Sequence, residues 1–230
     1  MPRLRFSLWM VMSVTLTGAL THPVFAGNTL EGQVKVYVKS GQPKIDHANV
    51  VVFLDAVEGT HVATAPSSDQ VMMASSYDRR FVPEVVPIVV GTTVEFPNED
   101  TIYHNVFSKS KTKIFDLGFY EHGQRRSVTF DQTGLVKVYC DIHSQMVGYI
   151  LVLNNPYFAV TDATGQYTIR EIPDGSYVVR AWQRFGPEQR QTVVLTGGTT
   201  STMTFELTEE KASIEHTNKW DRVYEETYRR

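Results

Sequence analysis

Short apolar stretches separated by turn residues run along most of this chain, and they predict β-strands. Residues 32–41 place Val34, Val36 and Val38 in alternation with other residues, which is typical of a strand with one buried face. Residues 49–55 form a continuous apolar run. Further strand-like stretches lie within residues 85–100, 126–140, 147–154, 165–183, 191–198 and 201–207. Many short strands at close spacing indicate an all-β fold, a sandwich or a barrel.

Two segments depart from this pattern. Residues 64–70 are polar and rich in Ser and Pro, which indicates a loop or a domain boundary. The last part of the chain is charged, and it places Trp220, Val223, Tyr224 and Tyr228 on one face of a helix. We therefore expect a short amphipathic helix within residues 209–230; a solvated tail is the alternative.

The first 26 residues resemble an export signal. Arg3 and Arg5 precede an apolar stretch, and the segment closes with small residues up to Ala26. This arrangement predicts a cleaved signal peptide over residues 1–26, and an uncleaved anchor is the alternative. We expect a periplasmic or secreted protein with no membrane span after cleavage.

Charge and cysteine content narrow the possible functions. The chain has a net charge of −3, which becomes −5 when residues 1–26 and their two arginines are removed. A mildly acidic protein is a poor candidate for binding nucleic acid. The chain has one cysteine, Cys140, so it cannot form an internal disulfide. In an oxidising compartment this thiol must be buried or bonded to something.

The residues around Cys140 suggest what it is bonded to. His143 and Met146 follow it in a short loop between two predicted strands. A thiolate, an imidazole and a thioether form a soft donor set, and a second imidazole would complete the trigonal site with a weak axial Met that suits blue copper. His104 is the candidate, because it follows a predicted strand and a polar turn.

These two segments resemble the cupredoxins, the small blue-copper proteins. The stretch from Gly91 to Ser108 and the stretch GLVKVYCDIHSQM carry the resemblance, and the Cys-x₂-His-x₂-Met spacing is similar to that of amicyanins. The resemblance covers roughly residues 70–153 and implies a Greek-key β-sandwich domain over residues 68–155. It also implies one type I copper per chain. The four ligand positions of the family are matched by His104, Cys140, His143 and Met146.

The resemblance also implies roles for neighbouring residues. Asn105 matches a position whose side chain ties the two ligand segments together by hydrogen bonds, which would hold the geometry of the ligands. In the family, the second ligand histidine exposes its edge on an apolar patch. Ile142 and Val147 are candidate members of such a patch, and core packing is the alternative for both.

Other readings of the same residues stay open. Zinc also binds Cys and His, although Met is a poor zinc ligand and structural zinc sites usually carry more cysteines. An inert buried thiol in a structural secreted protein is a further alternative. No additional His cluster for a second copper is visible in the sequence, and four ligands leave no open position for a substrate. We therefore expect an electron carrier and not an enzyme.

A basic strip lies in the same region. Lys109, Lys111 and Lys113 alternate along residues 108–113, and they are candidates for docking an acidic redox partner such as a c-type cytochrome or an exported oxidoreductase. An edge strand that lysines protect from aggregation explains the pattern equally well.

A second resemblance covers the rest of the chain. Residues 160–182 are similar to the transthyretin-type or carboxypeptidase-regulatory-like sandwich, and residues 32–50 carry the start of the same pattern. We therefore expect residues 29–58 and 156–208 to form one small Ig-like β-sandwich with the copper domain inserted between them. The alternative is a copper domain that includes residues 33–55, followed by a separate module.

The sequence thus predicts an exported mononuclear copper protein that carries single electrons between redox partners. The alternative function is a copper-binding, sensing or structural module of an envelope assembly. We expect neither nucleic acid nor a second metal among its ligands.

Overall fold

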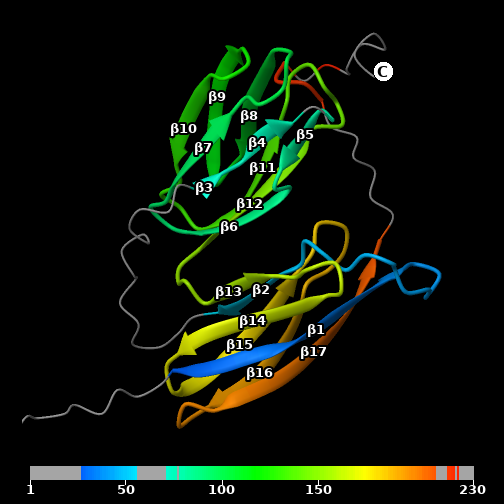
Figure 1. The fold of residues 1–230 in the computed structure, drawn as a ribbon, viewed down its shortest axis with the longest axis vertical. Coiled ribbons are helices and arrows are strands. Elements are labelled where there is room, and N and C mark those ends of the chain that lie inside the picture. Colours follow the sequence, from blue (N-terminus) through cyan, green and yellow to red (C-terminus); the bar gives the residue numbers. More distant parts are fainter. Residues whose placement is uncertain (1–26, 56–70, 77, 211–216, 221, 223–230) are drawn as a thin grey trace, which may run out of the picture.

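The fold comes from a computed structural model, which describes residues 27–55, 71–76, 78–210, 217–220 and 222. Within these residues the protein is all-β, which confirms the expected fold class, and its strands form an upper and a lower sandwich (Figure 1). In the described part of the chain, no helix is long and apolar enough to cross a membrane. The expected signal peptide, residues 1–26, lies outside the described residues.

The upper sandwich holds a five-stranded sheet, and its strands in sheet order are β6 (Val85–Val89), β12 (Val147–Leu153), β11 (Gly134–Tyr139), β8 (His104–Ser110) and β9 (Lys113–Tyr120). The strands that complete it are β10 (Arg125–Thr129), β7 (Thr93–Pro97) and β3 (Val71–Met72), which form one sheet, and the hairpin β4 (Ala74–Ser76) and β5 (Arg80–Val82). Alternate apolar residues of the two larger sheets meet in one buried core, which includes Phe96, Val106 and Ile150.

The lower sandwich also has two sheets. One contains β14 (Gln166–Ile172), β1 (Asn28–Val38) and β17 (Thr200–Glu209), and the other contains β13 (Phe158–Val160), β2 (Val51–Asp55), β15 (Gly175–Trp182) and β16 (Gln189–Leu195). The strand β1 pairs antiparallel with β14 and parallel with β17. Strands that precede the upper sandwich in the chain therefore share sheets with strands that follow it.

The domain boundaries drawn from the sequence stay a prediction. Strand pairing shows which segments share a sheet, but it does not say where one domain ends and the next begins. Residues 56–70, which connect β2 to β3, lie outside the described part of the chain.

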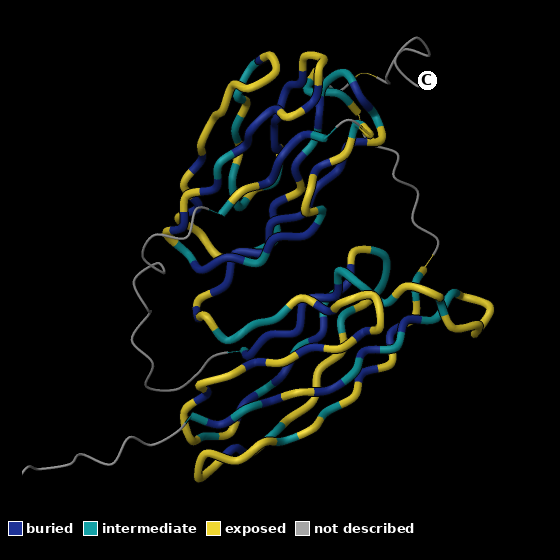
Figure 2. The backbone as a smooth tube through the Cα atoms, in the orientation of Figure 1, coloured by how far each residue is buried: buried dark blue, intermediate teal, exposed yellow. Residues whose placement is uncertain are grey.

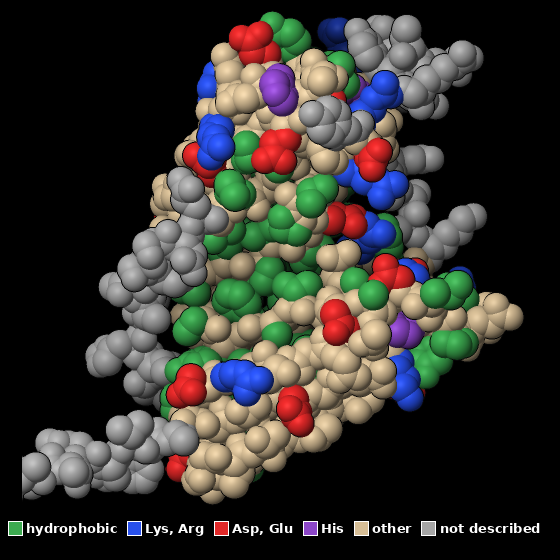
Figure 3. All heavy atoms as spheres, viewed as in Figure 1, with side chains coloured by type: hydrophobic (Ala, Val, Ile, Leu, Met, Phe, Trp, Pro, Cys, Tyr) green, Lys and Arg blue, Asp and Glu red, His purple; other side chains and the backbone are tan. Residues whose placement is uncertain are grey.

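The two sandwiches pack on each other through apolar side chains. Along β12, Ile150 points into the core of the upper sandwich, whereas Tyr149 and Leu151 point outward and meet Val51 and Phe53 of β2. The backbone on both sides of this junction is largely buried (Figure 2), and hydrophobic side chains fill the space between the halves (Figure 3). Both β12 and β2 are therefore covered on both faces, which explains their apolar sequences.

The C-terminal segment returns to the upper sandwich. Residues 217–220 lie beside its ligand-bearing end, and they form a turn (Figure 1, red). The predicted helix over residues 209–230 is wrong for this part, because Asn218 accepts hydrogen bonds from the backbone of Trp220 and Arg222 and closes a tight turn. The residues from 223 onward, on which the helical pattern also depended, lie outside the described part.

Candidate metal centre

The four candidate ligands lie at one end of the upper sandwich. His104 is the first residue of β8, and Cys140 directly follows β11. His143 and Met146 belong to the loop that leads from Cys140 to β12. Because β8 and β11 are neighbours in the sheet, the start of one and the end of the other meet at the same edge.

Three donor atoms converge there. The Sγ atom of Cys140 lies 3.7 Å from Nδ1 of His104 and 3.6 Å from Nδ1 of His143, and the two Nδ1 atoms are 3.1 Å apart. Such a triangle has a central point about 2 Å from each atom, and metal–nitrogen and metal–sulfur bonds are about 2.0–2.3 Å long. One metal ion therefore fits between these three residues without rearrangement.

Met146 closes the ligand loop. Its backbone N–H donates to the carbonyl of His143 at 3.0 Å, and its carbonyl accepts from the N–H of Cys140 at 3.3 Å. Its side chain is fully buried in the same apolar cluster as Cys140. The loop is thus a compact turn that holds the predicted weak ligand on the core side of the site.

The surroundings of the Cys140 sulfur favour binding of a metal by the thiolate form. Burial raises its pKa, so the thiol is neutral in the absence of a metal. The backbone N–H groups of Asn105, Ile142 and His143 donate toward the sulfur and act in the opposite direction. These three donors stabilise negative charge on the sulfur once a cation replaces the proton.

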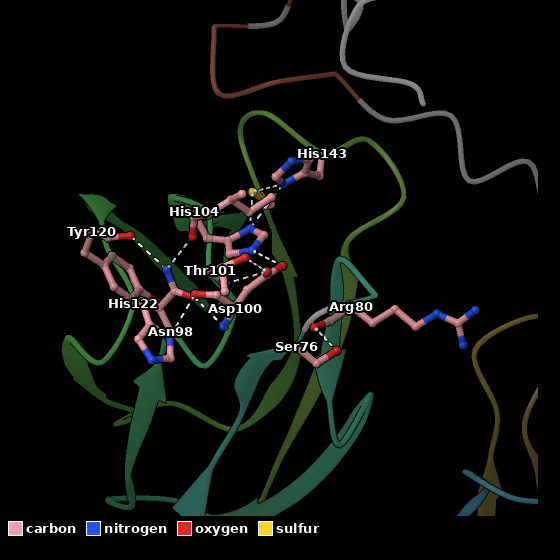
Figure 4. Close-up of polar contacts among 11 residues, drawn as sticks. Ser76, Arg80, Asn98, Asp100, Thr101, His104, Tyr120, His122 and His143 are labelled. Atoms are coloured by element: carbon pink, nitrogen blue, oxygen red, sulfur yellow. Dashed lines mark hydrogen bonds and ion pairs between the residues drawn. The ribbon is translucent and has the colours of Figure 1, made fainter.

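Asp100 is a site residue that the sequence analysis did not identify. Its Oδ2 lies 3.0 Å from Nε2 of His104, and both side chains are buried (Figure 4). Burial alone would raise the pKa of Asp100, but hydrogen bonds with His104 and Thr101 lower it, so the carboxylate is charged. A carboxylate on the far nitrogen of a ligand histidine fixes the tautomer and leaves Nδ1 free to bind metal.

The turn that carries Asp100 is held by Asn98. The Asn98 side chain donates to the carbonyls of Ile102 and Tyr120, and its Oδ1 accepts from the backbone N–H of Asp100 at 3.0 Å. An acidic residue four positions before the candidate histidine, in a polar turn, was the signal available in the sequence. The signal is weak, because such turns usually face solvent.

Both histidines are neutral at ordinary pH. Burial lowers the pKa of His104, although Asp100 opposes the shift. Burial lowers the pKa of His143 to about 4, and repulsion from the imidazole of His104 when that ring is protonated, and from Arg79, adds to the shift. His143 is only 5% exposed, so it presents less of its edge than the family resemblance implied. Arg79, in the turn between β4 and β5, is a second residue of the surroundings that the sequence analysis missed.

Asn105 does not tie the ligand segments together with its side chain as expected. Its Nδ2 donates to Oδ1 of Asp116 on β9 at 2.6 Å, and its Oδ1 has no hydrogen-bond partner among the described residues. The connection to the ligand loop runs through its backbone N–H, which donates to the sulfur of Cys140.

The residues predicted to dock a partner do not form one exposed surface around the candidate ligands. Val147 is buried at the junction of the two sandwiches, so its assignment to an exposed patch is wrong. Ile142 is half-buried and packs against the core. Lys109, Lys111 and Lys113 lie at the far end of the β8–β9 hairpin from His104, where Lys113 pairs with Asp131 at 3.0 Å. Their role in docking stays a prediction.

Comparison with known proteins supports copper as the metal. Residues 68–153 match the family model described as copper binding proteins, plastocyanin/azurin family. A search of curated proteins gives no match. The family match does not extend to the lower sandwich, whose resemblance to transthyretin-type modules stays a prediction.

Several solved structures are similar to part of the chain. A novel purple cupredoxin from Nitrosopumilus maritimus is 26% identical with a TM-score of 0.33, over 36% of this chain and 100% of that chain. A copper-containing nitrite reductase from Thermus scotoductus SA-01 is 29% identical with a TM-score of 0.36, over 44% of this chain and 25% of that chain. A reduced amicyanin variant is 19% identical with a TM-score of 0.35, over 44% of this chain and 98% of that chain.

The family match and the donor geometry agree. Residues 68–153 match the cupredoxin family, and the donor set of two imidazoles and one thiol in this stretch is soft and closely spaced. The site made by His104, Cys140, His143 and Met146 fits one type I copper ion.

Proposed function

We propose that this protein is an exported electron carrier with one type I copper per chain, bound by His104, Cys140, His143 and Met146. The observation that carries the proposal is the buried triangle of two imidazole nitrogens and one sulfur, with edges of 3.1–3.7 Å. The family match over residues 68–153 supports the same ion. Export is proposed from the composition of residues 1–26.

The burial of the ligands favours a carrier over an enzyme. His104, Cys140 and Met146 are fully buried, and His143 is 5% exposed, so the four side chains offer no open position for a substrate. Bound copper would supply a one-electron couple between Cu(I) and Cu(II). A compact ligand loop and a clamped histidine resist rearrangement when the charge at the site changes, and this keeps the barrier to electron transfer low.

His143 is the most accessible ligand, so electrons would enter and leave by way of its loop. A partner such as a c-type cytochrome or an exported oxidoreductase would approach this end of the upper sandwich. The lysines of the β8–β9 hairpin lie at the far end of that hairpin from His104, so they would act by long-range steering of an acidic partner, and this effect should weaken as salt is added.

Optical and EPR spectra of the copper-loaded protein test the proposal. We expect an intense visible band from charge transfer between thiolate and copper, and one copper per chain. Cys140→Ser should abolish the band, whereas Ser144→Ala, in the same loop, should keep it. A folded, copper-loaded wild-type protein without the band would refute the proposal.

The packing between the two sandwiches supports a second candidate function. In this alternative the protein is a copper-binding or sensing module of an envelope assembly. Val51 and Phe53 of the lower sandwich pack directly against the strand that follows the ligand loop. Occupancy of the site would then change a surface shared by both sandwiches. Rapid electron exchange with a c-type cytochrome in stopped-flow mixing supports the carrier, and slow exchange with unchanged copper binding supports the module.

A further inference from the structure

We propose that Lys219, in the C-terminal segment, is a positioning residue of the copper centre. In this proposal its ammonium group joins Asp116, which accepts a hydrogen bond from the residue after the first candidate ligand, to a carboxylate in the ligand loop, and its charge makes reduction of the site easier. The inference rests on the proposed function and adds to it a residue far away in the sequence. Neither the family resemblance nor the spacing of the ligands points to this residue.

Lys219 is held on the upper sandwich by several contacts. Its Nζ lies 3.0 Å from Oδ2 of Asp116 on β9 and 3.9 Å from Oδ2 of Asp141 in the ligand loop. Its backbone N–H donates to Oδ1 of Asp141 at 2.9 Å. The ammonium also lies 5.1 Å from the centre of the Phe119 ring, within the range of a cation–π interaction. The side chain is only 15% exposed, so these charges are partly shielded from water.

The turn around Asn218 presents this lysine. The Oδ1 atom of Asn218 accepts from the N–H of Trp220 at 3.0 Å and from that of Arg222 at 3.1 Å. The N–H of Asn218 donates to the carbonyl of Arg222 at 2.9 Å, and Lys109 donates to the carbonyl of Asn218 at 3.2 Å. The backbone of Lys219 is therefore fixed from both sides, which reduces the entropy lost when its side chain pairs.

Each of the two carboxylates is linked to the residue that carries the thiolate, one by hydrogen bonds and one along the chain. Asp116 accepts from the side chain of Asn105, whose backbone N–H donates to the sulfur of Cys140. Asp141 directly follows Cys140 in the chain. Lys219 thus makes the connection between β9 and the ligand loop that the side chain of Asn105 does not make.

The positive charge of Lys219 should raise the midpoint potential of the copper site. Two carboxylates near the sulfur favour the more positive, oxidised state of the site, and a cation between them offsets that effect. Removal of the cation should lower the midpoint potential and loosen the ligand loop. If Lys219 had only a structural role, its removal would lower the stability of the protein and leave the midpoint potential unchanged.

The test uses the full chain and four proteins: wild type, Lys219→Met, Lys219→Arg and Lys137→Met. Lys137 is an exposed lysine of β11, so its variant removes the same charge from the same sandwich. We expect spectroelectrochemistry to give a lower midpoint potential for Lys219→Met than for wild type and Lys137→Met. Lys219→Arg keeps the positive charge, so its midpoint potential should be close to that of wild type. Equal midpoints for Lys219→Met and Lys137→Met would overturn the proposal.

A second measurement does not depend on electron transfer. In the metal-free proteins, amide exchange within residues 140–146 should be about twofold to tenfold faster in Lys219→Met, as expected for the loss of a partly shielded ion pair. Unchanged exchange there would also count against the proposal. If the wild-type protein shows no blue band while Lys219→Met still speeds up exchange, the proposed function fails and the positioning role of Lys219 stands.

Discussion

At the residue scale, the two candidate ligand histidines are held in different ways. His104 is clamped by the carboxylate of Asp100, whereas His143 is kept neutral by burial and by nearby positive charge. The spacing of Cys140, His143 and Met146 was enough to predict a metal site, because these residues share one short loop. Asp100 was not predicted, because its role depends on a turn that directs it inward and the sequence signal for such a turn is weak.

Asp100→Asn should weaken copper binding. The amide keeps the shape of the side chain but removes the charge that orients His104, and losses of this kind typically reduce metal affinity by about 10- to 100-fold. A competition titration with a chelator of known affinity measures the change. Glu99→Gln, at the exposed neighbouring position, is the control and should bind like wild type. Equal affinities for the two variants would show that Asp100 does not orient the ligand.

The copper-free protein should lose stability in acid. The pKa of His143 is lowered from 6.5 to about 4 in the folded state, so between these values the unfolded chain binds a proton that the folded chain does not. The free energy of unfolding should therefore fall as the pH drops through this window. Denaturant titrations at several pH values measure it. His143→Asn should show a smaller fall; an equally steep fall would assign the effect to other groups.

At the scale of single strands, β1 shows how close packing restricts one position. β1 runs parallel to β17, and Gly32 lies opposite Met203. A Cβ atom at Gly32 would come within 1.8 Å of the Met203 carbonyl oxygen. The alternation of Val34 and Val36 predicted this strand correctly, but nothing in the alternation indicates that the neighbouring backbone is so near.

Gly32→Ala should destabilise the lower sandwich. The new methyl group forces β1 and β17 apart, and overpacking of this kind costs about 1–3 kcal/mol. Chemical denaturation measures the loss, and Glu31→Ala, at the exposed neighbouring residue, is the matched control. Equal stability of the two variants would mean that the strands can separate at little cost.

At the scale of the whole molecule, the junction makes the two sandwiches depend on each other. Phe53 of β2 and Tyr149 of β12 belong to one apolar cluster, and the ring of Tyr149 lies 5.8 Å from that of Trp182. Strands from both sandwiches are therefore buried on both faces. We expect the two sandwiches to unfold together as long as this cluster is intact.

Phe53→Ala should separate their unfolding. Truncation of a buried phenylalanine costs about 3–5 kcal/mol, and here the loss falls on the junction and the lower sandwich. Calorimetry should resolve two transitions in place of one, while the visible band of the copper-loaded protein stays unchanged below the first. Val194→Ala removes an exposed side chain from β16 and should keep the single transition. A single transition in Phe53→Ala would show that other contacts couple the two sandwiches.

The sequence by itself predicted the candidate ligands and most of the longer strands, but not β8 and β9. Alternating and continuous apolar runs report how deeply a strand is buried, and the Cys140 loop carries its donors at fixed, short spacing. Only the tertiary structure decided what lies on the other side of each buried face. Asp100, Lys219 and the junction partners of β12 come from distant parts of the chain, and periodicity records that a position is covered without recording which residue covers it.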